Sequence, residues 1–231
     1  MLYLISIGLW DENDMSLRGL ETAKKCDQIY MELYTVNLNT DAKKLSKLIG
    51  KPVKCLERKD LENGSKKILM QAKDNDVAIL VGGDALTATT HISLLQEARE
   101  LGIITNVIHG SSVLTAVGET GLQLYKFGKV TTLSADFSDS CYETIVTNKK
   151  NGLHTLVLLD IGMDAKTGLE TMLKRFDGKE KTVVACHLGG DSTIKYGSME
   201  SLLKESAKKT PAVIIVPGEL HFMEKEFLEG L

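Results

Sequence analysis

The sequence predicts an α/β protein with a parallel-rich sheet in its first half and a mixed sheet in its second half. In the first half, short apolar runs of strand length alternate with amphipathic stretches of helix length, the pattern of parallel β-α-β units. In the second half, extended runs at 182–188 and 192–197 follow each other without a helix, as in a hairpin. The 231 residues suffice for one large domain or two small ones. We expect two domains, at 1–112 and 113–231.

The elements of the first half follow from apolar runs and capping residues. A strand at 2–9 precedes a helix at 16–26, for which Ser16 is a suitable N-cap. The clearest unit is a buried strand at 77–81, followed by a Gly-Gly-Asp turn and a helix at 86–101 that Gly102 ends. The other expected elements are strands at 28–34, 52–56 and 103–108 and helices at 41–49 and 61–73.

The second half has a denser arrangement of strands. The strongest is the apolar run at 154–161, and a helix is expected after it at 166–176. The further expected elements are strands at 130–134 and 212–216 and helices at 199–208 and 219–228.

Composition disfavours several classes of protein. The formal net charge is −3, whereas nucleic-acid-binding proteins usually present a basic face, so we expect no nucleic-acid partner. The four cysteines are far apart and lack metal-binding spacing, which favours free thiols in a reducing compartment. The N-terminus lacks the basic start of a signal peptide, and no stretch approaches the roughly 18 apolar residues of a membrane helix. We therefore expect a cytoplasmic protein with no membrane partner.

Common catalytic motifs are absent from the sequence. There is no GxxxxGK[ST], no GxGxxG after a strand, no GxSxG and no HExxH. These absences disfavour a P-loop nucleotidase, a Rossmann dinucleotide site, an α/β-hydrolase and a dedicated metal site.

Three turns rich in small residues follow predicted strands. They lie at 8–11, 82–87 and 109–113. Ligands of open α/β sheets bind outside the carboxyl ends of the strands, so the three turns can converge on one ligand. The alternative is that each turn only connects a strand to a helix N-terminus. The hydroxyl cluster in Thr87-Ala-Thr-Thr-His91 leaves the same choice between a ligand-facing turn and local capping.

These residues carry a resemblance that spans nearly the whole chain. The segment Gly83-Asp-Ala-Leu-Thr-Ala-Thr-Thr-His91 resembles the GDPLxATTH signature of the diphthine synthase family, part of the tetrapyrrole-methylase-like class. Other segments that are similar to the family in order and spacing lie at 8–11, 17–23, 30–35, 109–118, 121–128, 152–161 and 214–221.

The resemblance implies an enzyme of two α/β domains, usually a homodimer, with the cofactor in the cleft between the domains. The implied cofactor is S-adenosyl-L-methionine, which leaves as S-adenosyl-L-homocysteine. The implied reaction is methylation of the amino group of the 3-amino-3-carboxypropyl-histidine intermediate on translation elongation factor 2, which gives diphthine. The implied cofactor contacts are Leu9, Asp84, Thr87, Ser112, Val113, Leu159, Leu188 and Ala212.

No residue is assigned as the catalytic base. Asp84 is the nearest carboxylate in the predicted turns, and we favour cofactor contact over proton transfer for it. Structural roles are favoured for His91, His109 and Trp10, while Glu32 and Tyr34 are equally compatible with a ligand-facing position and a plain strand end.

The chain also departs from the family pattern. Ala85 stands where the signature has Pro, and Val36 where Ser is usual. The segment 134–142 lacks a Trp-x-Pro stretch, and the region between 160 and 182 is shorter than usual. Alternative functions are therefore a related methyltransferase that acts on a tetrapyrrole or on RNA, and a non-catalytic cofactor-binding protein of the same fold.

Overall fold

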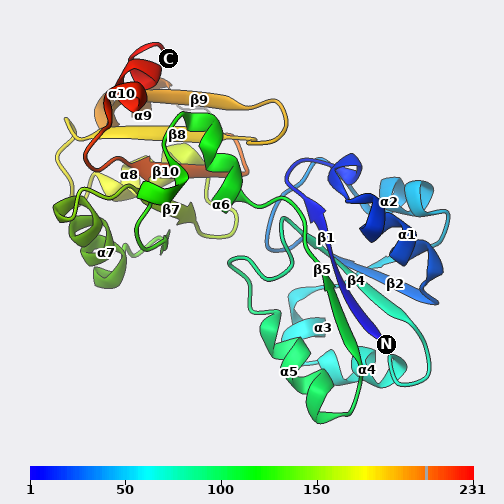
Figure 1. Ribbon diagram of the computed structural model, residues 1–231. Coiled ribbons are helices and arrows are strands. Elements are labelled where there is room, and N and C mark those ends of the chain that lie inside the picture. The colour runs from blue at the N-terminus through cyan, green and yellow to red at the C-terminus, as the bar shows by residue number, and fades with distance from the viewer. Residues whose placement is uncertain (206–207) are drawn as a thin grey trace. The chain divides into compact units, whose positions relative to one another are not determined.

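The computed structural model describes residues 1–205 and 208–231. The chain divides into two compact units, Met1–Val113 and Leu114–Leu231. The division therefore falls one residue after the domain boundary expected from the sequence. Each unit is built around a sheet of its own (Figure 1).

The first unit contains a fully parallel sheet. Its strands lie in the order β3-β2-β4-β1-β5, and each neighbouring pair is parallel. The strands are β1 (Leu2–Gly8), β2 (Gln28–Glu32), β3 (Val53–Cys55), β4 (Val77–Gly82) and β5 (Thr105–Ile108). The central strands β1 and β4 are almost wholly buried, as their near-continuous apolar runs predicted.

Helices cover both faces of this sheet (Figure 1). On one face pack α1 (Leu17–Lys25) and α2 (Ala42–Ile49), which contribute Ala23 and Leu45 to the core. On the other face pack α3 (Arg58–Glu62), α4 (Ser65–Gln71) and α5 (Ile92–Glu100). Ser16 caps α1, as predicted, because its side chain accepts a hydrogen bond from the Gly19 N–H.

Two helix predictions in the first unit were wrong. The helix expected at 61–73 is broken into α3 and α4, because the chain leaves helical geometry at Asn63 and Gly64. The helix expected at 86–101 begins only with α5 at Ile92. The preceding segment forms a loop held by its own polar side chains, with Ala88 at a φ of 55°.

The second unit contains a mixed sheet in the order β6-β7-β10-β8-β9. Only β6 and β7 are parallel, and the predicted hairpin is confirmed by the antiparallel pairing of β8 with β9. The strands are β6 (Thr131–Leu133), β7 (Thr155–Leu159), β8 (Lys181–Cys186), β9 (Thr193–Ser198) and β10 (Ala212–Val216). A parallel sheet followed by a mixed sheet confirms the predicted fold class.

One face of the mixed sheet packs against three helices. These are α7 (Asp139–Lys150), α8 (Ala165–Met172) and α9 (Met199–Glu205). The helix α7 was not predicted, because it is mostly polar and buries only Cys141, Ile145 and Asn148. The remaining helical elements are η1 (Glu12–Asp14), α6 (Val113–Ala116), η2 (Val117–Thr120), η3 (Leu124–Lys126) and α10 (Phe222–Glu229).

The predicted ends of three helices in the second unit differ from the structure. α8 ends at Met172 rather than at residue 176, and α10 starts at Phe222 rather than at residue 219 because His221 caps it. The helix expected at 199–208 is α9, and residues 206–207 of that prediction lie outside the described residues.

Two expectations about the surface and the thiols can be compared with the structure. Within the described ranges, no helix combines the length and the apolar character that crossing a membrane requires. All four cysteines are free thiols, and only Cys55 is exposed.

Candidate functional site

The three turns singled out in the sequence meet at one edge of the parallel sheet. Their strands β4, β1 and β5 are adjacent and parallel, so their carboxyl ends lie side by side. The Gly8 N–H donates to the Gly83 carbonyl at 3.2 Å, and the Gly83 N–H donates back to the Gly8 carbonyl at 2.7 Å. This reciprocal pair joins the first turn to the second, so the two turns lie side by side at this edge.

Asp84 joins the second turn to the third. Its Oδ2 accepts from His109 Nδ1 at 2.8 Å and from the Gly110 N–H at 3.2 Å. Its Oδ1 accepts from the Leu86 N–H at 3.0 Å and from Thr87 Oγ1 at 3.2 Å. Four donors therefore converge on one carboxylate, and together they fix the shape of both turns.

The same contacts keep Asp84 ionised. Its burial raises the pKa of the carboxyl group, but the hydrogen bonds from the Leu86 N–H, His109 and the Gly110 N–H outweigh burial and leave the pKa below its ordinary value. A carboxylate with a lowered pKa is a weak proton acceptor near neutral pH. Asp84 therefore presents a fixed negative charge at the edge of the sheet rather than a general base.

A buried serine on β1 anchors the second turn from below. Ser6 is 1% exposed, and its Oγ accepts a hydrogen bond from the Ala85 N–H at 2.9 Å. Gly110 lies so close that a Cβ on it would come within 2.7 Å of the Ser6 Cβ. The third turn therefore needs a residue without a side chain at this point.

The other cofactor contacts expected in the first unit lie in the three joined turns. Leu9, Thr87 and Val113 are half-buried, and Ser112 is buried. Leu9 follows Gly8 in the first turn, Thr87 bonds Asp84 in the second, and Ser112 and Val113 end the third. The sheet therefore brings all five predicted residues of this unit to one edge.

The three cofactor contacts expected in the second unit gather at one end of the mixed sheet. Ala212 begins β10 and pairs with Cys186, the last residue of β8. The next residue of β10 pairs with Leu158, so Ala212 is also level with Leu159 at the end of β7. Leu188 follows two residues after Cys186, and the intervening His187 N–H donates to the carbonyl of Pro211. These residues thus form a second group, in their own unit.

Sequence reasoning missed the roles of Ser6 and His109 in this site. Ser6 is the one hydroxyl residue in the buried run of β1, and such a polar residue at a core position was the available signal. His109 has a structural role, as favoured, but it acts through Asp84 and remains 68% exposed. Trp10 is half-buried beside η1, where its backbone N–H donates to Asp14 Oδ2.

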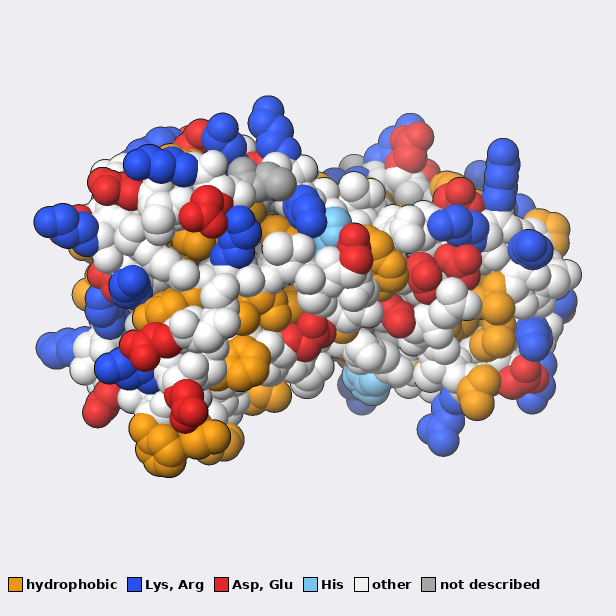
Figure 2. Space-filling view, turned by 90° about the horizontal axis from the view of Figure 1, so that it is seen from above, with side chains coloured by type: hydrophobic (Ala, Val, Ile, Leu, Met, Phe, Trp, Pro, Cys, Tyr) orange, Lys and Arg blue, Asp and Glu red, His pale blue; other side chains and the backbone are white. Residues whose placement is uncertain are grey.

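Neither the charged side chains of the face in Figure 2 nor the potential metal ligands of the described residues form a cluster. On the face shown in Figure 2, lysines and arginines are interspersed with aspartates and glutamates. Among the residues that the structure describes, no three His, Cys, Asp or Glu side chains are grouped closely enough to hold a metal ion.

The chain is similar to known proteins along almost all of its length. The family model of Tetrapyrrole (Corrin/Porphyrin) Methylases matches residues 1–218. The diphthine synthase of Methanocaldococcus jannaschii is 40% identical, with 100% of this chain and 98% of the relative covered. That of Methanocella arvoryzae is 39% identical with the same coverage.

Solved structures agree with this similarity. A crystal structure of a diphthine synthase superposes with a TM-score of 0.94 at 36% identity, covering 99% of this chain and 94% of the other. A putative diphthine synthase from Entamoeba histolytica gives a TM-score of 0.90 at 34% identity, covering 100% and 97%.

Proposed function

Because the chain belongs to the diphthine synthases within the tetrapyrrole methylase family, we propose that it is the methyltransferase that makes diphthine. The methyl donor is S-adenosyl-L-methionine. The acceptor is the amino group of the 3-amino-3-carboxypropyl-histidine intermediate on translation elongation factor 2. The observation that carries the proposal is full-length similarity to diphthine synthases, together with an ordered signature loop at 83–91.

The residues at the edge of the parallel sheet fit such a methyl donor. Leu9 and Val113 offer apolar surface suited to an adenine ring, and the hydroxyls of Thr87 and Ser112 suit a ribose and an amino-acid group. A Cβ on Gly83 would meet no atom within 4 Å, so the backbone there is open to a ligand. S-adenosyl-L-methionine supplies a methyl group on a positively charged sulfur.

Asp84 contributes charge and order rather than proton transfer. Its carboxylate stays ionised and favours a cationic ligand nearby. Four hydrogen bonds hold the Asp84 carboxylate, so the turns keep one shape before S-adenosyl-L-methionine binds. Less conformational entropy is therefore lost on binding. Methyl transfer to an amine then depends mainly on holding the two reactants in line. The proton of the amine leaves to solvent.

Further parts of the proposal follow from the family. Leu159, Leu188 and Ala212 are proposed as additional contacts to the methyl donor. The enzyme is proposed to act in the cytoplasm as a homodimer, with elongation factor 2 as its protein substrate.

The first test is a calorimetric titration of the purified chain with S-adenosyl-L-homocysteine. One saturable site is expected in the wild type, and Asp84→Ala should bind at least about tenfold more weakly, the equivalent of about 1.4 kcal/mol. Asp41→Ala is the matched control, because Asp41 also accepts two backbone N–H groups, those of Lys43 and Lys44, but caps α2 away from the turns. A wild-type chain that does not bind would refute the cofactor assignment.

The second test is methyl transfer itself. Labelled S-adenosyl-L-methionine is supplied with elongation factor 2 that carries the 3-amino-3-carboxypropyl histidine, and label should enter the protein. Unmodified elongation factor 2 is the negative control. Binding of the cofactor product with no transfer to this acceptor would favour an acceptor of another class, a tetrapyrrole or RNA, or a non-catalytic role.

A further inference from the structure

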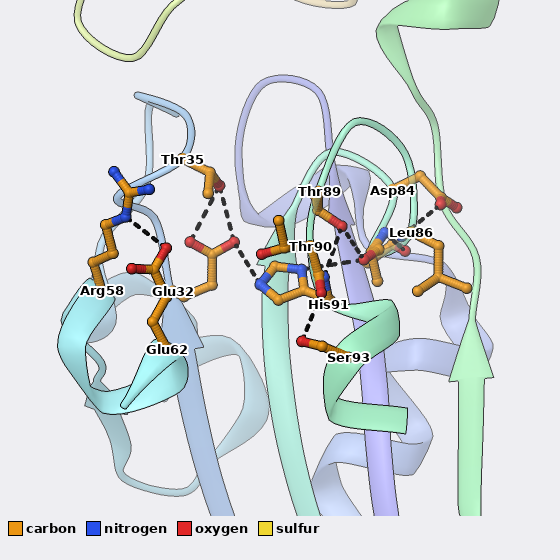
Figure 3. A network of polar contacts seen from close by, with 12 residues as sticks. Glu32, Thr35, Arg58, Glu62, Asp84, Leu86, Thr89, Thr90, His91 and Ser93 are labelled. Carbon is orange, nitrogen blue, oxygen red and sulfur yellow. Dashed lines mark hydrogen bonds and ion pairs between the residues drawn. The ribbon is translucent and has the colours of Figure 1, made fainter. Parts of the chain in front are cut away.

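A buried acid and a buried histidine lie together beneath the signature loop. Glu32 ends β2 and is 0% exposed, and His91 ends the loop and is 3% exposed. The Glu32 Oε1 is 3.7 Å from His91 Nε2, and Thr35 Oγ1 donates to both carboxylate oxygens, at 2.9 and 3.1 Å. Figure 3 shows the imidazole between the carboxylate and the loop. The proposed reaction gives no role to either residue.

The hydrogen bonds of His91 determine where its protons lie. His91 Nδ1 is 3.2 Å from the carbonyl oxygen of Ala85, and a carbonyl oxygen only accepts, so Nδ1 carries a hydrogen. If the ring is neutral, Nε2 is a bare acceptor that faces another acceptor, the Glu32 carboxylate. That arrangement is repulsive, and the burial of both side chains strengthens the repulsion. One additional proton between Glu32 and His91, on either group, removes the repulsion.

His91 is connected to the candidate cofactor site through a single residue, Ala85. The carbonyl of Ala85 accepts from His91 Nδ1 and from Thr89 Oγ1, the latter at 3.0 Å. The N–H of Ala85 donates to Ser6 Oγ. Ala85 directly follows Asp84, whose carboxylate joins the turns. A change at His91 therefore reaches Asp84 through one fixed residue.

We propose that Glu32 and His91 are positioning residues that share one buried proton, and that this proton holds the loop at 84–91 in the shape that binds the methyl donor. The inference rests on the proposed function, since it concerns the same site. Loss of the proton at alkaline pH leaves a buried, repelling pair of acceptors and loosens the carbonyl of Ala85.

The electrostatic surroundings of Glu32 are consistent with a retained proton. Burial raises the pKa of Glu32 and outweighs four opposing contributions: the Thr35 hydroxyl, the nearby His91, and the backbone N–H groups of Thr35 and Tyr34. Among the described residues, the other charged or titratable groups that face this region are Tyr34 and, on α3, Arg58 and Glu62, which form an ion pair. Burial and Glu32 raise the pKa of Tyr34 to about 12, so Tyr34 stays neutral.

The test uses two substitutions of the same residue. A glutamine at position 32 mimics a permanently protonated Glu32, because its amide N–H donates to His91 Nε2 while its oxygen accepts from Thr35. Affinity for S-adenosyl-L-homocysteine is measured by calorimetry from pH 6 to about pH 9.5. The wild type is expected to bind more weakly as the pH rises. Glu32→Gln should keep the neutral-pH affinity with a flatter profile, and Glu32→Ala should bind at least about tenfold more weakly at neutral pH.

Controls separate positioning from general destabilisation. Glu62→Gln makes the same chemical change on α3 at an exposed position and should keep the wild-type profile. In a His91→Ala background, Glu32→Ala should have little additional effect, because the two residues act through one proton. A structural role alone would lower the unfolding temperature of the variants but would not flatten the pH profile of Glu32→Gln.

The possible outcomes distinguish failure of the inference from failure of the proposed function. Equal affinity of Glu32→Ala and wild type, or the same pH profile for Glu32→Gln and wild type, overturns the inference and leaves the proposed function intact. Absence of binding by the wild type at every pH refutes the proposed function, and the inference fails with it.

Discussion

Glu224 accepts hydrogen bonds from four donors in the second unit, and its replacement should destabilise that unit strongly. Glu224 lies in α10 and is 1% exposed. It accepts hydrogen bonds from the N–H groups of Gln123 and His221, from Lys126 Nζ and from His154 Nε2, at 2.8, 2.7, 2.5 and 3.0 Å. These donors come from three separate segments, so one carboxylate ties α10 to η3 and to the start of β7.

The charge state of His154 in this network is fixed by its neighbours. The Gly218 N–H donates to His154 Nδ1 at 3.0 Å, so that nitrogen carries no hydrogen. Nε2 therefore carries the hydrogen of a neutral ring and donates it to Glu224. Burial lowers the pKa of His154, against the pull of Glu224, and keeps the ring neutral.

The expected loss of stability follows from the pKa of Glu224. Burial raises this pKa, but the four donors outweigh burial and lower it from 4.5 to about 2. A shift of this size corresponds to about 3 kcal/mol of stability. Because the folded-state pKa is lowered, the contribution is present above the unfolded-state value and is lost as the pH falls towards 2.

Glu224→Gln should therefore lower the free energy of unfolding by about 3 kcal/mol at neutral pH and by less than half as much near pH 3. The assay is urea denaturation followed by far-ultraviolet circular dichroism at both pH values. Glu226→Gln, two positions along α10 and exposed, is the control and should change stability by less than about 0.5 kcal/mol. A Glu224→Gln variant as stable as wild type at neutral pH, or equally destabilised at both pH values, would refute the reasoning.

Two further predictions concern backbone groups. Ser6→Ala leaves the Ala85 N–H buried without its partner and should cost about 1–3 kcal/mol of stability in the first unit. The loss can be measured by denaturation followed through the fluorescence of the single tryptophan, Trp10. An unchanged denaturation midpoint would contradict this prediction. Gly121 and Gly50 have nearly equal φ values of +78° and +79°, but a Cβ on Gly121 would lie 2.2 Å from the Phe227 ring, whereas one on Gly50 would meet nothing within 4 Å. Alanine at Gly50 should cost about 1–2 kcal/mol for backbone strain, and alanine at Gly121 a further 1–3 kcal/mol or so for the clash, so equal melting temperatures for the two variants would disprove the packing argument.

The sequence was most informative where burial alone decides structure. The strands β1 and β4 are buried on both faces, so their apolar runs marked them without ambiguity. It was least informative for α7, whose 12 residues are stabilised by burying only three side chains and by the Ser138 cap. A cap followed by small or apolar residues at positions 141 and 145 was a signal, but a weak one.

The sequence predicted the location of the candidate site but not the hydrogen bonds within it. Glycine-rich turns after three strands indicated the edge of the sheet at which we propose that the methyl donor binds. The start of α5 was predicted six residues too early because helical propensity was weighed without the competing bonds that Thr89 and His91 make to the carbonyl of Ala85. Both bonds are local, but the Ala85 residue that accepts them is itself held by Ser6 on β1, and that contact requires β1 to lie next to β4. Strand order of this kind is not encoded in any single segment.

The alanine at position 85 illustrates how tertiary contacts replace a local constraint. The family signature has proline there, and a proline ring fixes φ but has no N–H. In this chain the N–H is present and donates to Ser6, while the carbonyl of the same residue accepts from Thr89 and His91. The peptide groups on both sides of Ala85 are therefore fixed by three side chains from β1 and the loop. The rigidity that a ring supplies locally is supplied here by hydrogen bonds from β1 and from the loop itself, so the geometry of Asp84 depends on Ser6, Thr89 and His91.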